Sequence, residues 1–326
     1  MTILKQSICG LALASLSSPL LQANPNDLFA SAGSSTVNSA SPVAPNRIVA
    51  QKVVDLTVDQ ALKKYRLSHK GAGSGFLNPN LFGSLDFTAN NGYGGGNAGD
   101  IDSTILTTTV GTSFTTFYDI SLGGLFSWSG SDGHSDFSTY SDSDTFTGSL
   151  FASKTITPWM LGGLSGSYGA TNTRWSSFPL PPATKQPDVD TDTWTVTPYL
   201  AFFTNVGNWS FSASPMYSVS MQASDYNTFG VADTNGSTGI VTLATTVNYA
   251  ITPQWTWNIN LAPMWTTNYE GQSVASDQPD RMNVNVGTGT NFNITDTIGF
   301  NLAFQYNAFN RDSESYTVTG GINVAF

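Results

Sequence analysis

Residues 316–326, YTVTGGINVAF, alternate apolar and polar side chains without a break. Successive side chains of a β-strand point to opposite faces, so this stretch has one apolar face and one polar face. The apolar face comprises Tyr316, Val318, Gly320, Ile322, Val324 and Phe326. The pattern predicts the closing strand of a transmembrane β-barrel, because such a barrel pairs its last strand with its first and leaves no unpaired edge in lipid.

Four residues of this strand also have a recognisable spacing, namely Thr319, Gly321, Val324 and Phe326. It resembles the C-terminal signal by which bacterial barrel proteins reach the outer-membrane assembly machinery. The resemblance implies two partners, that machinery and the lipid of the outer membrane.

The alternation with period two extends back along the chain to Leu81. Its clearest runs are 209–222, 255–269 and 298–309, with weaker runs beginning near Ser103, Phe117, Asp144, Trp159, Thr193, Thr238 and Met282 and a faint one at 81–89. Most runs span about 12 to 15 residues, whereas strands of soluble proteins average about five or six. The chain is therefore predicted to be all-β, a transmembrane antiparallel up-and-down β-barrel of about twelve strands.

Aromatic residues lie at both ends of the predicted apolar faces. Trp255 and Trp265 are ten residues apart, which is about 33 Å of strand, or about 25 Å across the membrane at a tilt of ~40°. We expect two membrane-interface girdles: Trp159, Trp209, Trp255 and Phe292 in one, and Trp128, Tyr168, Trp194, Trp265 and Tyr316 in the other. Each of these aromatics taken singly is also compatible with a protein core.

Short and long connections alternate along the predicted strands. The short ones are 115–116, 157–158, 205–208, 252–253 and 295–296, and the long ones are 91–100, 130–143, 172–190, 224–237 and 270–280. Barrels of this class keep tight turns in the periplasm and longer loops outside. We therefore expect an even number of strands, with both ends of the barrel in the periplasm of a Gram-negative cell.

Charge is scarce and unevenly distributed. Only 10% of the 326 residues are charged, although 12% are aromatic; disordered chains avoid aromatic residues. Residues 47–70 contain six basic and two acidic residues, whereas the chain from Gly71 onward contains five basic and nineteen acidic ones. An acidic body argues against a nucleic-acid partner.

The segment before the barrel divides into two parts. Residues 1–23 have the layout of a signal peptide, with Lys5 before an apolar stretch and a cleavage site after Ala23. Cys9 lies in it, so no disulfide is expected in the mature chain. Residues 24–75 are predicted to form a flexible linker and a short basic helix, either a pore plug or a periplasmic stub, and residues 76–326 the barrel.

The polar faces of the strands carry Ser, Thr, Asn, Gln and Gly. Asp86 and Asp119 are the expected charged exceptions, and Lys154 lies at a strand end. Two alternatives remain open: a weakly selective pore for small polar solutes, as in porins, or a lumen filled by side chains or by the basic helix.

Sites for chemistry are few. His134, within 131–136, has Ser and Asp neighbours, but Gly, Ser and Asp are also ordinary turn residues. The alternate carboxylates Asp188, Asp190 and Asp192 have a spacing seen in Ca²⁺ loops, without the Gly and Glu of an EF-hand. We rank solvated acidic loops above calcium, and we expect no enzymatic activity and no cofactor.

Residues 81–326 resemble the barrel domain of bacterial autotransporters. The resemblance rests on the strand number, on hairpins that turn just before Trp159, Trp209 and Trp255, on the glycine-rich stretch 161–169 and on the final strand. It implies an outer-membrane translocator, with a helix in the pore that 58–67 would match. About 50 residues separate the expected cleavage site from the barrel, so we expect no sizeable passenger. The alternative is a structural or adhesive surface protein with acidic loops and a blocked lumen.

Overall fold

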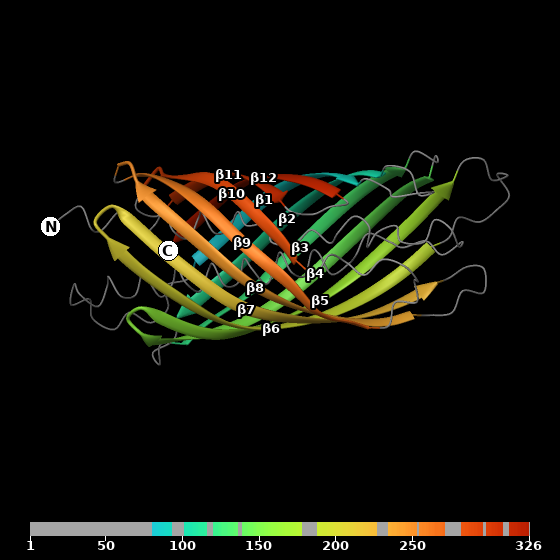
Figure 1. Ribbon diagram of the computed structural model, residues 1–326, viewed down its shortest axis with the longest axis horizontal. Helices are drawn as coiled ribbons and strands as arrows, with labels where there is room; N and C mark the ends of the chain where they lie inside the picture. Colours follow the sequence, from blue (N-terminus) through green and yellow to red (C-terminus); the bar gives the residue numbers. More distant parts are fainter. Residues whose placement is uncertain are drawn as a thin grey trace.

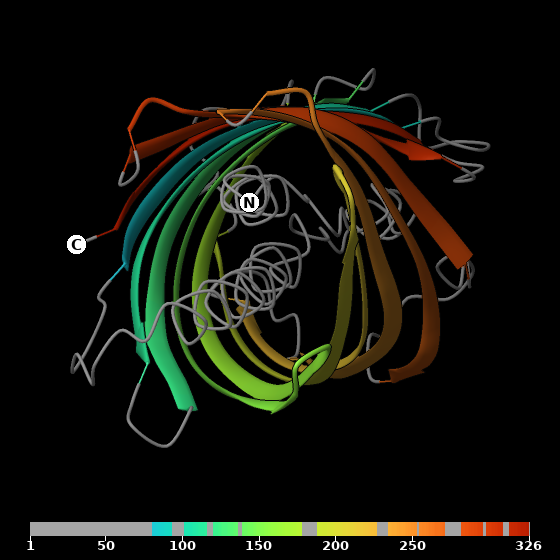
Figure 2. The ribbon, with the colours of Figure 1, turned by 90° about the vertical axis from the view of Figure 1, so that its left-hand side faces the viewer.

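Twelve antiparallel strands form one closed barrel in the computed structural model (Figures 1 and 2). The structure describes residues 80–92, 101–115, 120–135, 139–177, 188–226, 234–252, 254–270, 282–295, 298–308 and 313–325. The strands are β1 (Asn80–Gly92), β2 (Ile101–Thr115), β3 (Ile120–Ser135), β4 (Thr139–Thr157), β5 (Met160–Ser177), β6 (Asp188–Val206), β7 (Trp209–Tyr226), β8 (Thr234–Ala250), β9 (Trp255–Glu270), β10 (Met282–Asn293), β11 (Ile298–Ala308) and β12 (Ser313–Ala325). The predicted fold class is confirmed.

Several sequence-based expectations lie outside the described residues: the signal peptide 1–23, the linker and helix 24–75, Asp119 and Phe326. Within the part of the chain that is described, no helix is long and apolar enough to cross a membrane.

Closure of the barrel depends on the pairing of β1 with β12. Thirteen residue pairs join them without interruption, from Asn80 opposite Ala325 to Gly92 opposite Ser313. On β12, Tyr316, Val318 and Ile322 are exposed on the outer face, whereas Thr317 and Thr319 are buried on the inner face. The closing role predicted for this strand is therefore confirmed.

The register of the strands sets the tilt and width of the barrel. We start at Asn248 on β8 and step to the directly opposite residue on each next strand. After one circuit of the barrel the path returns to β8 at Thr234, fourteen positions before Asn248. With standard strand spacings, a stagger of this size in a twelve-stranded barrel corresponds to a tilt of about 40° and a backbone diameter of roughly 23 Å.

The connections occupy the two ends of the barrel differently. Tight turns link β4 to β5, β6 to β7, β8 to β9 and β10 to β11 at the end where β1 begins and β12 ends, on the left in Figure 1. We call this the tight-turn end and the opposite one the far end. Two turns begin with a threonine whose hydroxyl accepts a backbone N–H: Trp255 donates to Thr252 over 3.1 Å, and Ile298 donates to Thr295 over 2.9 Å. Gly207, in the β6–β7 turn, has a φ of 62°, which glycine adopts without strain.

The predicted long loops are partly wrong in extent. Residues 130–143 were expected to be a loop, but β3 continues to Ser135 and β4 resumes at Thr139. Similarly, β5 continues to Ser177 and β6 begins at Asp188 within the expected loop 172–190. At the far end both faces of these strands carry polar residues, so the alternation that marks a strand in the sequence disappears while the backbone pairing continues.

Three inward-pointing aromatic residues each lie directly opposite a glycine on the next strand. Phe82 faces Gly111, Phe151 faces Gly123 and Tyr199 faces Gly163. A Cβ added at any of the three glycines would overlap the facing ring, and at Gly163 it would also lie 2.9 Å from the carbonyl oxygen of Ala152. Each ring therefore fills the space left by a missing side chain.

These close approaches predict that Gly163→Ala destabilises the barrel by about 1–3 kcal/mol, the usual cost of overpacking a filled interior. Gly166→Ala is the matched control, because no heavy atom lies within 4 Å of a Cβ added there. Urea unfolding of detergent-solubilised protein, followed by tryptophan fluorescence, measures both variants. Equal stability of the two would contradict the packing described here.

Candidate functional site

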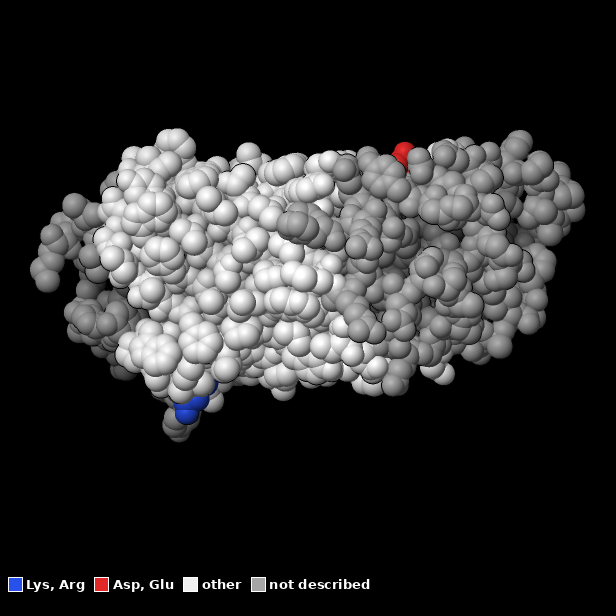
Figure 3. All heavy atoms as spheres, viewed as in Figure 1, with Lys and Arg blue, Asp and Glu red and all other residues white. Residues whose placement is uncertain are grey.

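The outer face of the barrel presents large apolar side chains to its surroundings. On β11, Phe300, Leu302 and Phe304 are each about half exposed, at 51%, 53% and 44%, and they alternate with buried inward residues. Figure 3 shows hardly any charged atom among the described residues on the face in view. An exposed apolar surface of this extent marks contact with a membrane or another apolar partner.

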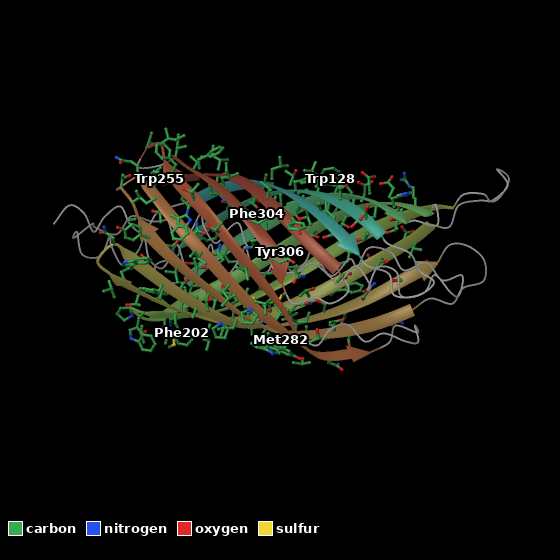
Figure 4. The ribbon with its side chains drawn as sticks, turned by 45° about the horizontal axis from the view of Figure 1, so that its top comes forward. Trp128, Phe202, Trp255, Met282, Phe304 and Tyr306 are labelled. Atoms are coloured by element: carbon green, nitrogen blue, oxygen red, sulfur yellow. The ribbon has the colours of Figure 1, made fainter. Side chains whose placement is uncertain are left out.

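All the aromatics predicted for the girdles lie on this outer face. Trp159, Trp209, Trp255 and Phe292 are exposed next to the tight turns, and Tyr168, Trp194, Trp265 and Tyr316 are exposed on the same side of their strands further along. Trp128 points outward but is only partly exposed, and its indole Nε1 donates to Asp144 over 3.2 Å. In Figure 4, Trp255 lies near the tight-turn end and Trp128 toward the far end. Their role at a membrane interface stays a prediction.

The structure adds aromatic partners that the sequence pattern did not single out. Tyr249 packs on Trp209 with ring centroids 4.7 Å apart, Tyr306 packs on Tyr316 at 5.1 Å, and Phe202 packs on Trp159 at 6.1 Å. Each partner lies on the neighbouring strand, between ten and about forty residues away in the sequence, so the register is needed to reveal the contacts. Such pairs typically contribute about 0.5–1.5 kcal/mol beyond the burial of area.

Acidic residues gather on the outer side of the far end, on strands rather than in the loops that were predicted. Asp132 lies directly opposite Asp142, and Asp190 lies directly opposite Asp225. Lys154 also points outward, near the tight-turn end of β4. Arg174 lies directly opposite Asp142 and Asp188 at the far end, so this end presents a rim that is mainly, but not wholly, negative.

The carboxylates proposed for a calcium loop are held by a strand. Alternate residues of a strand lie about 7 Å apart on one face and do not converge. Asp190 accepts a hydrogen bond from Asn172 over 2.8 Å, and Asp192 accepts one from the Tyr168 hydroxyl over 2.6 Å. Among the described residues, no three His, Cys, Asp or Glu side chains are arranged to hold a metal ion.

His134 is exposed on β3, directly opposite Asp102 on one side and Tyr140 on the other. The residues that lie beside His134 across the sheet are therefore Asp102 and Tyr140, which the sequence around His134 does not contain. The expectation that the chain is not an enzyme stays a prediction.

The inner face on β2–β7 is lined by hydroxyl groups that pair across neighbouring strands. Thr107 lies 2.7 Å from Ser129, Thr145 lies 2.9 Å from Thr171, and Thr195 lies 2.9 Å from Ser220, oxygen to oxygen. A hydroxyl both donates and accepts, so directly opposite Ser and Thr side chains satisfy each other. We call this surface the hydroxyl wall.

The inner face on β8–β11 carries amides as well as hydroxyl and apolar side chains such as Thr242, Thr256 and Met264. We define the amide wall as Asn248, Asn258, Asn260, Asn301, Gln305 and Asn307, all of which are at least 95% buried. Asn248 lies directly opposite Asn258, and Asn258 and Asn260 occupy successive inward positions of β9. The sequence showed that polar faces contain Asn and Gln, but only the register gathers them on one side.

Among the described residues, the charged side chain on the inner face is that of Asp86, as predicted from the sequence. It lies on β1 at the seam with β12 and is 4% exposed. Its carboxylate accepts hydrogen bonds from the hydroxyl of Thr319 over 2.6 Å and from that of Ser84 over 3.4 Å. Thr319, a residue of the predicted assembly signal, thus also holds Asp86 at the closing seam.

The fold is that of outer-membrane β-barrels, and in particular of autotransporter translocator domains. The translocator domain of NalP from Neisseria meningitidis superposes with a TM-score of 0.67 at 8% identity, covering 87% of this chain and 99% of that domain. The transport unit of AIDA-I from Escherichia coli superposes with a TM-score of 0.60 at 10% identity, covering 81% of this chain and 97% of that unit. The β domain of the Bordetella autotransporter BrkA superposes with a TM-score of 0.55 at 10% identity, covering 76% of this chain and 100% of that domain. No protein-family description and no curated protein matches the sequence. The resemblance inferred from the sequence is therefore confirmed at the level of the fold.

A charge in the middle of the outer apolar face tests whether lipid covers it. We expect Leu302→Arg to lower the stability of the barrel in phospholipid vesicles by about 2–4 kcal/mol, because the guanidinium would have to enter hydrocarbon. Ala303→Ser, one residue later on the inner face, is the matched control and should change it by less than about 1 kcal/mol. The measurement is a urea titration in vesicles, and an unchanged midpoint for Leu302→Arg would argue against a lipid-covered face.

Proposed function

We propose that the chain is an integral protein of the bacterial outer membrane whose lumen is a weakly selective pathway for small polar solutes. The observation that carries the proposal is the contrast between the two faces of one closed sheet. Outward side chains are large and apolar, and described inward side chains are mostly neutral and polar. A ring of this kind separates a polar interior from hydrocarbon, as in known membrane barrels.

Orientation follows from the connections. Tight turns of transmembrane barrels face the periplasm, and longer loops face outward. The tight-turn end, where β1 begins and β12 ends, would then face the periplasm, and the acidic rim would lie at the cell surface. Delivery by the outer-membrane assembly machinery through Thr319, Gly321, Val324 and Phe326 belongs to the same proposal.

Weak ionic selectivity is expected because the described inner face lacks rings of charge. Selective pores place several like charges around a constriction, whereas Asp86 is the charge found on the described inner wall. The likeness to autotransporter translocators supports the architecture, and transport of a polypeptide through the lumen is a variant of the same proposal.

Recording in planar lipid bilayers tests the pore directly. The full chain and a form lacking residues 24–75 should both be measured, because that segment is predicted to contain the basic helix. We expect steady conductance steps in at least the shortened form. Silence of both forms would refute the pore and favour the second candidate below.

A change of one charge then probes the ion pathway. Asp86→Asn should lower the preference of the pore for cations over anions by about twofold. One charge roughly 10 Å from an ion in water changes the energy of the ion by about 0.4 kcal/mol, which corresponds to that factor. Asp144→Asn, on the outer face of β4, is the matched control and should leave selectivity unchanged. Reversal potentials in a salt gradient measure both, and an equal response of the two variants would place the ion path elsewhere.

The second candidate is a structural or adhesive surface protein with a blocked lumen. The observation that favours it is the acidic rim, in which Asp132 opposes Asp142 and Asp190 opposes Asp225. Arg174 lies directly opposite Asp142 and Asp188 and offsets part of this charge, but the rim stays predominantly acidic, which suits a basic partner at the cell surface.

A further inference from the structure

The two walls of the lumen differ in whether their polar atoms are satisfied. On the amide wall, both side-chain polar atoms of Asn248, Asn301 and Asn307 lack a hydrogen-bond partner, as do Asn258 Nδ2, Asn260 Oδ1 and Gln305 Oε1. The hydroxyl wall also contains single unpartnered hydroxyls, such as Ser127 and Thr147. These are scattered among paired hydroxyls, whereas the unpartnered amides adjoin one another.

For three of the amides the register accounts for a missing partner on one side. Asn258 lies directly opposite Gly289, Gln305 lies opposite Gly287, and Asn301 lies opposite Gly321. The side chain of Asn301 extends over Gly321, where an added Cβ would collide with Asn301 Oδ1, and an added Cβ at Gly287 would collide with the Cγ of Gln305. At Gly289 an added Cβ would lie 3.1 Å from Asn258 Nδ2. Glycine has no side chain with which to return a hydrogen bond, so the sheet itself leaves these amides unsatisfied.

Unsatisfied amides at 95% burial or more are energetically costly. A buried polar group without a hydrogen bond typically costs about 1–3 kcal/mol, and native proteins contain few of them. Several such groups side by side therefore favour an occupant, water or a ligand, that offers hydrogen bonds. Because an amide carries both a donor and an acceptor, that occupant must do the same.

The charge of the surroundings restricts the occupant further. The Lys and Arg side chains that the structure describes, Lys154 and Arg174, are both exposed on outward positions. The described inner wall thus offers no cation to an anionic ligand, and Asp86 repels one. An apolar ligand would leave the amides unsatisfied. Water and neutral ligands rich in groups that both donate and accept meet these conditions.

We propose that the amide wall is a binding surface for neutral polyhydroxylated solutes, that is, sugars. Every sugar hydroxyl donates and accepts, so a short oligosaccharide can satisfy Asn258 and Asn260 on β9 together with Asn301 and Gln305 on β11. The proposal rests on the proposed function, since it requires a lumen that solutes can enter, and it names the class of solute. The lumen therefore has a binding side, the amide wall, and a self-satisfied side, the hydroxyl wall.

Calorimetry with maltotriose on the full chain in detergent tests the proposal. We expect saturable binding that Asn258→Ala combined with Asn301→Ala weakens at least about tenfold, the equivalent of losing two or more hydrogen bonds. Thr195→Val combined with Ser220→Ala removes a pair from the hydroxyl wall and should leave the affinity within about twofold. Should the alanine pair fail to fold, Asn307→Ser supplies a milder change that is expected to weaken binding about threefold.

Two comparisons make the outcome decisive. Polyethylene glycol of the same mass accepts hydrogen bonds but hardly donates them, so equal binding of it would show that the lumen is merely filled. Absence of maltotriose binding would mean that water satisfies the amides, and the proposal would be wrong. A pore that conducts ions but binds no sugar refutes this inference alone, whereas sugar binding without conductance refutes only the conducting pore.

Discussion

Hydrocarbon offers no hydrogen bonds, and this constraint governs the whole barrel. Every strand must find a partner on both sides, because each unsatisfied backbone group in lipid costs several kcal/mol. Among the described strands, β1 and β12 are the neighbours that are not consecutive in sequence, and thirteen residue pairs join them. Removal of this seam would leave two unpaired edges in the membrane, so the other contacts depend on it.

In the closed barrel, successive side chains of each strand point alternately to the lipid and to the lumen. Outward positions hold Leu, Phe, Trp and Val, and inward positions hold Ser, Thr and Asn, with Phe82, Phe151 and Tyr199 placed where glycine leaves room. Glycine thus serves two purposes in this lumen. Opposite an aromatic ring it creates a filled interior, and opposite Asn or Gln it creates unsatisfied polar atoms.

The sequence predicted the strands well wherever one face meets an apolar environment. On β9 and β12 the parity of apolar residues matches the exposed positions. It failed at the far end, where β3 and β4 carry polar residues on both faces and the segment 130–143, which belongs largely to these strands, was predicted to be a loop. The inward aromatics were also missed, although Tyr199 has the same parity as the inward Thr195 and Thr197.

By itself, the sequence determined the alternation, the approximate strand number and the outward position of the girdle tryptophans, because these depend only on neighbours one or two residues apart. Which residues face each other across strands was decided by the tertiary structure alone. The stagger of fourteen positions around the ring brings Asn248 to Asn258 and Asn301 to Gly321. A single-residue slip would exchange the two faces, so the register is imposed by burial of the entire outer surface and cannot be found in any one strand.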